Sequence, residues 1–491
     1  MNSPSSIEIA TSRTNPMRER GNDLTPWLAM RVNVEGGRER HAAPMPWKIL
    51  IACACIIAAV EAVLAWGVGI ERPWRGDEPH FVKTIVHFGT RPLSLDLLTH
   101  YDEMSGPLPF VLYGAWGRMF GFEPQTLRLF SILVAVATYV MLFWFLESET
   151  GNWHLAAWGT AFVVLHPYML YLSLFVYTDM LAIMCLIGAI VAVRRERPVW
   201  LAAALCGAVL NRQYLVFATA AAGIYYLARL LRHREPELTE FWRAQLQPEI
   251  SAARRRDLRQ LLAVAASVIP LTSLCVLWKG LCPDGNLKQY YLEKHPTFHI
   301  SSLVLYVSLM SIYLAPVLAA RWREFFGRPE PLIVAATLCW LYWLFPVCPS
   351  PIAFEQLGPE ASLGMLHLTL RRLFDNAVLE HLTFFTGFAG GLAIVTSLAV
   401  DAWRRWRMGH IDFQLFLDLT ALAFLAVMPC SYLNWEKYFM PLVPVLLLRM
   451  LFVPFRERVA VTDGVHVAFC APVCPAGEHS DTPEECLTTN V

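Results

Sequence analysis

The sequence carries little charge. Only 16% of its 491 residues are Asp, Glu, Lys or Arg, whereas soluble globular proteins average about 25%. Forty Lys and Arg balance forty Asp and Glu, so the formal net charge is zero, and just six of the cations are Lys. The absence of a net positive charge argues against a nucleic-acid partner. With 56% hydrophobic residues, disorder, a collagen-like fibre and a small disulfide scaffold are also excluded, and a polytopic membrane protein remains.

The chain also has no P-loop, no GxGxxG motif and no apolar core of signal-peptide length in its first residues. Residues 1–46 are polar and hold six Arg, so we expect an uncleaved, disordered cytoplasmic segment. Residues 456–491 are expected to be a disordered cytoplasmic tail. Four residues of this tail loosely match the spacing of a zinc site: Cys470, Cys474, His479 and Cys486. The alternative is a disordered tail with unpaired cysteines. We expect no bound metal.

Long apolar runs, by contrast, are plentiful. A membrane span needs about 20 mostly apolar residues, and on that basis we predict an all-α protein with about twelve transmembrane helices within residues 47–455. Residues 107–121 are too short and too rich in Pro and Gly to cross, and are predicted to form an interfacial helix. The predicted spans are 47–70, 127–146, 153–170, 177–193, 199–213, 214–231, 260–281, 300–320, 331–347, 383–401, 412–430 and 437–454.

The basic residues favour one orientation in the membrane. With these spans, the loops assigned to the inside hold 17 Lys and Arg in 62 residues, and the loops assigned to the outside hold 9 in 121. This asymmetry is what the positive-inside rule requires, and it places the loop 71–126 outside. The inside loops are 147–152, 194–198, 229–259, 321–330 and 402–411.

Two acidic pairs stand out in the outer loop 71–126. Asp77-Glu78 opens an amphipathic pattern in which Asp77 is a natural helix N-cap, and Asp102-Glu103 precedes the predicted interfacial helix. In a reaction at a membrane face, one carboxylate could take a proton from an attacking hydroxyl, while another orients the acceptor or holds a divalent metal. The alternative is that these residues are helix caps and solvated loop charges.

Three further segments place polar side chains on the predicted outer face. Arg212 interrupts an apolar run at evident cost, which favours a functional role, and Lys437 could serve either as a phosphate ligand or as an interfacial anchor. The segments are Tyr177-Thr178-Asp179, Asn211-Arg212-Gln213-Tyr214 and Tyr432-Leu433-Asn434-Trp435-Glu436-Lys437-Tyr438-Phe439.

In their order along residues 70–450, these segments resemble the GT-C glycosyltransferases. The resemblance is strongest to the family of dolichyl-phosphate-glucose alpha-1,2-glucosyltransferases of N-glycan precursor assembly, although that family has Arg where Lys437 stands. The matching residues are Asp77, Glu78 and His80; Tyr177, Thr178 and Asp179, followed by Arg212 and Gln213; and Glu436, Lys437, Tyr438, Phe439 and Pro441.

The resemblance implies an inverting transfer of a hexose, expected to be glucose, from a polyprenyl (dolichyl) phosphate to a glycan or lipid-linked oligosaccharide acceptor. It implies Asp77 as general base, Glu78 and Asp102 as residues that orient the acceptor, and Arg212 and Lys437 as ligands of the donor phosphate. No cofactor is implied beyond the lipid-linked co-substrate. The substrate-binding residues would be His80, Glu103, Tyr177, Asp179, Gln213 and Glu436.

If the resemblance holds, we expect the protein in the plasma (inner) membrane of a bacterium or the endoplasmic reticulum membrane of a eukaryote, with its site on the non-cytoplasmic face. Two alternatives stay open. One is a GT-C transferase with a protein, glycolipid or cell-wall acceptor. The other is a lipid or sugar transporter, although a transporter would place charges and broken helices near the membrane midplane.

Overall fold

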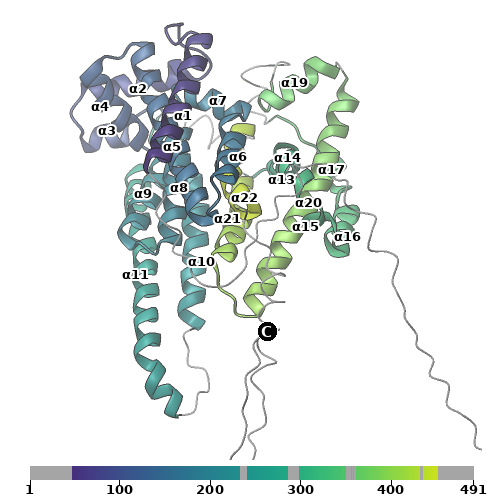
Figure 1. Cartoon of the computed structure of the whole chain (residues 1–491). Helices are drawn as coiled ribbons and strands as arrows, with labels where there is room; N and C mark the ends of the chain where they lie inside the picture. The colour runs from purple at the N-terminus through teal and green to yellow at the C-terminus, as the bar shows by residue number, and fades with distance from the viewer. Residues whose placement is uncertain are drawn as a thin grey trace, which may run out of the picture.

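The computed structural model describes residues 47–232, 240–285, 298–349, 355, 358, 361–374, 376–431 and 435–451. All regular elements within these ranges are helices (Figure 1). The all-α class predicted from the apolar runs is therefore confirmed. The predicted segment 1–46, the tail 456–491 with its cysteines, and Tyr432–Asn434 lie outside the described residues.

The first half of the chain forms a row of apolar helices with a group of short helices inserted after the first. These elements are α1 (Trp47–Val68), α2 (Glu78–Thr90), α3 (Leu95–Thr99), α4 (Leu108–Phe120), α5 (Pro124–Thr150), α6 (Trp153–Val164), α7 (Pro167–Leu174), α8 (Asp179–Arg194), α9 (Pro198–Asn211), η1 (Gln213–Leu215), α10 (Val216–Arg232) and α11 (Glu240–Trp278).

The second half alternates long helices with short ones. Its elements are α13 (Ile300–Tyr313), α14 (Ala315–Ala320), α15 (Trp322–Phe326), α16 (Pro329–Leu338), α17 (Leu341–Leu344), α19 (Met365–Phe374), α20 (Ala377–Arg407), α21 (Phe413–Val427), η4 (Met428–Cys430), η5 (Glu436–Phe439) and α22 (Leu442–Leu451).

Each of the twelve predicted spans contains a helix, but their lengths differ. Six helices of the described chain are long and apolar enough to cross a membrane, or seven if the bent pair α6–α7 is one span. That pair bends by 72° at His166, whose extended backbone precedes Pro167, because a residue before proline avoids the helical region. The helices that meet the length criterion are Trp47–Val68, Pro124–Thr150, Gln213–Arg232, Ser251–Trp278, Ala377–Arg407 and Phe413–Cys430.

The break predicted at Asn211-Arg212-Gln213 is confirmed. Helix α9 ends at Asn211, Arg212 takes an extended conformation, and the chain resumes as η1 and α10. The break frees backbone groups of Asn211, and its carbonyl accepts a hydrogen bond from Gly106 at 3.1 Å. The polar interruption thus connects this turn to the first outer loop.

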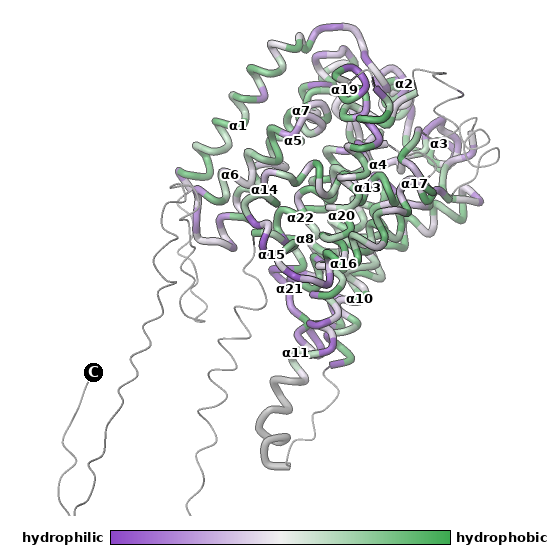
Figure 2. Tube along the Cα trace, turned by 90° about the vertical axis from the view of Figure 1, so that its right-hand side faces the viewer, coloured by the Kyte–Doolittle hydropathy of each residue, from purple (hydrophilic) through white to green (hydrophobic). Residues whose placement is uncertain are grey.

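The helices of the outer loop lie at one end of the bundle. Helices α2, α3 and α4, together with α19, lie at the upper end in Figure 1, and polar colouring marks connections at this end in Figure 2. The predicted helices of the outer loop are confirmed as α2 and α4, which pack against each other. This end of the bundle carries the two acidic pairs.

Buried charges pair with one another towards the opposite end of α20. Asp418 bonds Arg449 and lies 3.5 Å from Arg405, and Asp401 lies 3.0 Å from Arg449 and 2.6 Å from Arg328. Because buried charges are tolerated when they are paired, this network explains how Asp418 and Arg449 can stand inside apolar helices. It connects α16, α20, α21 and α22.

Candidate active site

The centre of the site is an ion pair between Asp77 and Lys437. The Lys437 Nζ lies 2.7 Å from the Asp77 Oδ2, and the side chains are 9% and 37% exposed, respectively. Three aromatic rings surround the ammonium, with centroids at 4.5 Å for Trp435, 5.2 Å for Tyr177 and 5.8 Å for Tyr438. The rings shield the lysine from water, and the carboxylate keeps an open side.

Asp77 occupies the N-cap position of α2, but its side chain makes no capping hydrogen bond. The predicted N-cap position is therefore confirmed without its side-chain hydrogen bond, because the carboxylate turns to Lys437 instead. Burial acts to raise the pKa of Asp77, yet the positive charges of Lys437 and Arg212, together with the smaller effect of His80, outweigh it and hold the pKa below its ordinary value. The carboxylate is thus ionised near neutral pH and is placed to accept a proton.

A second ion pair, between Arg212 and Asp179, lies beside the first. The Arg212 Nη2 is 2.6 Å from the Asp179 Oδ2, and its Nη1 donates to Ser105 Oγ at 3.0 Å. Both side chains are buried. The guanidinium also lies 5.8 Å from the Tyr438 ring centroid, at the same distance as the Lys437 ammonium, so the two predicted phosphate ligands share one aromatic neighbour.

Glu78, the neighbour of Asp77, points away from this cluster. Its side chain is fully buried, and both carboxylate oxygens bond Arg128, at 3.0 Å from Nε and 2.5 Å from Nη2. The backbone amides of Val176 and Arg75 also donate to it, each at 2.9 Å. The expected role in orienting an acceptor does not suit this geometry, because the protein already engages both oxygens of Glu78.

Arg128 is a site-supporting residue that the sequence reasoning missed. Besides holding Glu78, its guanidinium donates to the carbonyls of Ile70, Arg72 and Pro73 at 2.8, 2.7 and 3.2 Å. It thereby fixes the connection between α1 and α2. The available signal was an arginine standing one residue inside an apolar run predicted to span the membrane.

The second acidic pair approaches the cluster through His80. The His80 Nε2 lies 3.3 Å from the Glu103 Oε1. Burial raises the pKa of Glu103 to about 8 against the opposing effect of Arg212, and burial lowers the pKa of His80 despite the nearby Asp102 and Asp77. Glu103 is therefore neutral at physiological pH. Asp102 is half-buried and lies close to Gly285.

The segment carrying Glu103 is held in place by backbone contacts. Gln213 Nε2 donates to the Met104 carbonyl at 2.9 Å, so this predicted substrate-binding residue binds the loop itself. Gly106 packs so tightly that an added Cβ would lie 2.0 Å from the Leu210 carbonyl oxygen. Only glycine fits there, and the close approach brings Ser105 within reach of Arg212.

Glu436, also predicted to bind substrate, is buried beneath α19. Its carboxylate accepts hydrogen bonds from the backbone amides of Leu366 and His367 at 2.9 and 2.8 Å and from the Tyr313 hydroxyl at 2.8 Å. A carboxylate at the first amides of a helix satisfies donors that have no partner within the helix and complements its dipole. Glu436 therefore anchors α19 next to Lys437.

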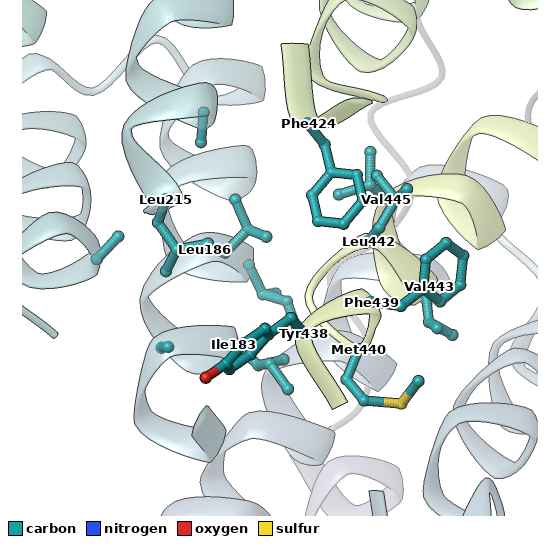
Figure 3. Packing of buried hydrophobic residues seen from close by; sticks show 14 of the residues in the cluster. Ile183, Leu186, Leu215, Phe424, Tyr438, Phe439, Met440, Leu442, Val443 and Val445 are labelled. Atoms are coloured by element: carbon teal, nitrogen blue, oxygen red, sulfur yellow. The ribbon is translucent and has the colours of Figure 1, made fainter. Parts of the chain in front are cut away.

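Apolar packing positions η5 and its lysine. Figure 3 shows Tyr438 and Phe439 among buried residues of α8, α21 and α22. The Tyr438 ring lies 5.5 Å from that of Tyr214, and the Phe439 ring lies 6.1 Å from that of Phe424. Because Tyr438 and Phe439 directly follow Lys437 in the sequence, burying their rings fixes the short helix from which Lys437 reaches Asp77.

The structure thus brings together Asp77, Lys437, Arg212, Asp179, Tyr177, His80 and Glu103. Several buried polar atoms of this region have no hydrogen-bond partner among the described residues, and a polar ligand could satisfy them: Thr178 Oγ1, Asp179 Oδ1, Arg212 Nε, Tyr214 Oη and Trp435 Nε1. In the described parts of the chain, no three or more His, Cys, Asp and Glu side chains are grouped to hold a metal ion.

Comparisons with known proteins add one structural likeness. No protein-family model matches the chain, and no curated protein does. Among solved structures, the chain is similar to the crystal structure of ArnT from Cupriavidus metallidurans in the apo state, at 14% identity and a TM-score of 0.36. The match covers 82% of this chain and 76% of that one. At this identity and score, the assignment of function has to rest on the residues themselves.

Proposed function

We propose that the protein is a membrane glycosyltransferase of the GT-C type that moves a hexose from a polyprenyl-phosphate donor to a glycan hydroxyl with inversion. The observation that carries the proposal is the contact between an ionised carboxylate with an open side and a shielded ammonium. A transfer from a lipid phosphate needs both groups together, one for the acceptor proton and one for the departing phosphate. The resemblance described above implies the same two roles for Asp77 and Lys437, which supports the proposal.

In the proposed reaction, Asp77 accepts the proton of the acceptor hydroxyl. The hydroxyl oxygen forms a bond to the anomeric carbon, the bond from that carbon to the phosphate oxygen breaks, and the electron pair leaves on the phosphate. Lys437 stabilises the negative charge that develops there, and its screening from water strengthens the interaction. The donor carries its own activation, so no nucleotide site is needed.

The other residues fall into two groups in this proposal. Arg212, which is held in place by Asp179, adds positive potential near the phosphate. Tyr177 and His80 line the region next to Asp77. Glu78, Glu436 and Gln213 support the site from within the protein. Glucose as the hexose, a dolichyl chain on the donor, a lipid-linked oligosaccharide as acceptor and a site on the non-cytoplasmic face belong to the same proposal.

Transfer of radiolabelled glucose from a polyprenyl-phosphate glucose to lipid-linked oligosaccharides, in membranes containing the protein, tests the proposal. We expect wild-type protein to form labelled product and Asp77→Asn to form essentially none, because the amide cannot accept the proton. Asp96→Asn is the matched control, since Asp96 lies in the same loop with an 83% exposed side chain, and it should keep wild-type activity.

Full activity of a folded Asp77→Asn variant would remove the catalytic assignment. If purified protein moved donor lipid or sugar across vesicles and formed no glycosidic bond, the enzyme proposal itself would fail. Mass spectrometry of lipid-linked glycans from a deletion strain then identifies the acceptor, because the glycans should lack one terminal hexose.

A further inference from the structure

The Asp77–Lys437 ion pair occupies the two groups that the proposed reaction needs. A carboxylate bonded to an ammonium at 2.7 Å is a weakened base, because the cation stabilises its ionised form. An ammonium neutralised by a carboxylate likewise attracts a phosphate less strongly. Each group therefore has to be released from the other before it can act.

The neighbouring Arg212–Asp179 pair shows why the first pair can open. Asp179 is fully buried, and Arg212 is additionally held by Ser105, so separating this pair would leave an isolated buried charge at high cost. Asp77 is more than one-third exposed, and water or a substrate hydroxyl can replace its partner. One pair is thus fixed, while the other is able to exchange partners.

We infer that the Asp77–Lys437 pair is a donor-sensing latch, in which the phosphate of the lipid donor takes Lys437 and thereby frees Asp77 to act as the base. The inference rests on the proposed function and adds an order to it, because the donor has to bind before the acceptor hydroxyl can be deprotonated. Lys437 is suited to this exchange, since an ammonium carries three rotatable donors on a flexible stem. The charged and hydroxyl groups that face Asp77 are Lys437, Arg212, His80, Glu103, Tyr171 and Tyr177.

The same exchange resets the site after transfer. Asp77 then carries the acceptor proton, and the lipid phosphate holds the electron pair of the broken bond next to Lys437. When Asp77 loses the proton to water, its carboxylate becomes ionised and competes for Lys437 again. This competition promotes release of the polyprenyl phosphate, so a site without Asp77 should retain this product.

Binding of a short-chain polyprenyl phosphate to purified full-length protein in nanodiscs tests the latch. We expect Asp77→Asn to bind about tenfold more tightly than wild type, the order of effect seen when a close charge pair is uncoupled. Asp96→Asn is the matched control, because it removes a negative charge from the same loop at an exposed residue outside the ion pair, and it should change the affinity far less. Lys437→Met should weaken binding.

A double-mutant cycle separates the latch from general electrostatics. In the Lys437→Met background, Asp77→Asn should no longer tighten binding, because the residue it competes for is gone. Unchanged or weaker binding by Asp77→Asn, or an equal gain in Asp96→Asn, would overturn the latch. Asp77→Ser, which also removes the charge, replaces Asp77→Asn if thermal unfolding shows that the amide variant does not fold.

The binding measurements and the transfer assay report on different claims. If wild-type protein transfers hexose while Asp77→Asn binds no more tightly, the latch fails and the proposed function stands. If wild-type protein transfers no hexose from any polyprenyl-phosphate sugar, the proposed function fails, whatever the binding shows.

Discussion

Asp77 and Glu78 are adjacent carboxylates in opposite surroundings. Asp77 faces a lysine and keeps an open side, while Glu78 is fully enclosed by Arg128 and two backbone amides. The two side chains have different surroundings because successive residues of a helix point about 100° apart around its axis. The first carboxylate is therefore available for chemistry, and the second stabilises the turn that presents it.

The role of Glu78 can be tested by Glu78→Gln. The variant leaves the Arg128 guanidinium buried without a charged partner, which costs about 3–5 kcal/mol for pairs of this kind. We expect a marked loss of stability in thermal or denaturant unfolding in detergent, and activity lost in proportion to the folded fraction. Glu123→Gln, at an exposed residue of the same outer loop, should unfold like wild type. Wild-type stability with abolished transfer would instead assign Glu78 to catalysis.

The raised pKa of Glu103 predicts that activity falls at alkaline pH. Burial raises its pKa to about 8, so the side chain is neutral below that pH and becomes negative above it. The new charge would lie near Arg212 and repel the donor phosphate, so kcat/KM for the donor should fall as the pH rises through about 8. Glu103→Gln stays neutral and should lose this alkaline limb. Its persistence in Glu103→Gln would show that another group titrates there.

At the scale of elements, the main feature is the attachment of α19 to η5. Glu436 accepts the first amides of α19, and the next residue along the chain is Lys437. From the other side, Glu380 of α20 holds α19 through His367 at 2.6 Å and Arg371 at 3.3 Å. Helix α19 is thus clamped by these two carboxylates, and the Glu436 clamp is the one continuous with the site.

The two clamps predict different effects. Glu436→Gln loses charge-assisted hydrogen bonds worth about 1.5–3 kcal/mol, so hydrogen exchange in Met365–Phe374 should rise about tenfold or more, with a fall in kcat/KM for the donor. Glu380→Gln should also raise exchange in α19 but leave kcat/KM near the wild-type value. Equal loss of activity in both variants would mean that α19 itself contacts the substrate.

At the scale of the whole molecule, the sequence predicts helix positions well because helices depend on local apolar runs and polar breaks. The interruption at Arg212 marks the end of α9, and the Pro- and Gly-rich stretch after Gly106 forms α4. The sequence does not predict which charges meet, because pairing joins residues far apart along the chain. Arg128 illustrates this limit, since its partner lies 50 residues earlier. The residues of the cluster around Asp77 could be singled out from the acidic pairs of the outer loop and the polar breaks, and the resemblance to a known family grouped them into one site.

The orientation of the whole bundle remains a prediction from the basic loops. Asp96→Cys should react with a membrane-impermeant maleimide from the non-cytoplasmic side, and Glu330→Cys only after permeabilisation. Both positions have exposed side chains, at 83% and 48%, and labelling is measured as the increase over the parent chain. The reverse pattern would place the site on the cytoplasmic face.

The distance along the chain between Asp77 and Lys437 has a consequence for biogenesis. The two residues are 360 positions apart, and at synthesis rates of about 5–20 residues per second the lysine emerges about 20–70 s after the carboxylate. During that interval, a nascent chain exposes the acidic loop without the cation that would hold a lipid phosphate. In the proposed reaction, an unfinished or truncated protein would therefore not consume a lipid-linked sugar, and transfer would begin only after Lys437 and the last helix are in place.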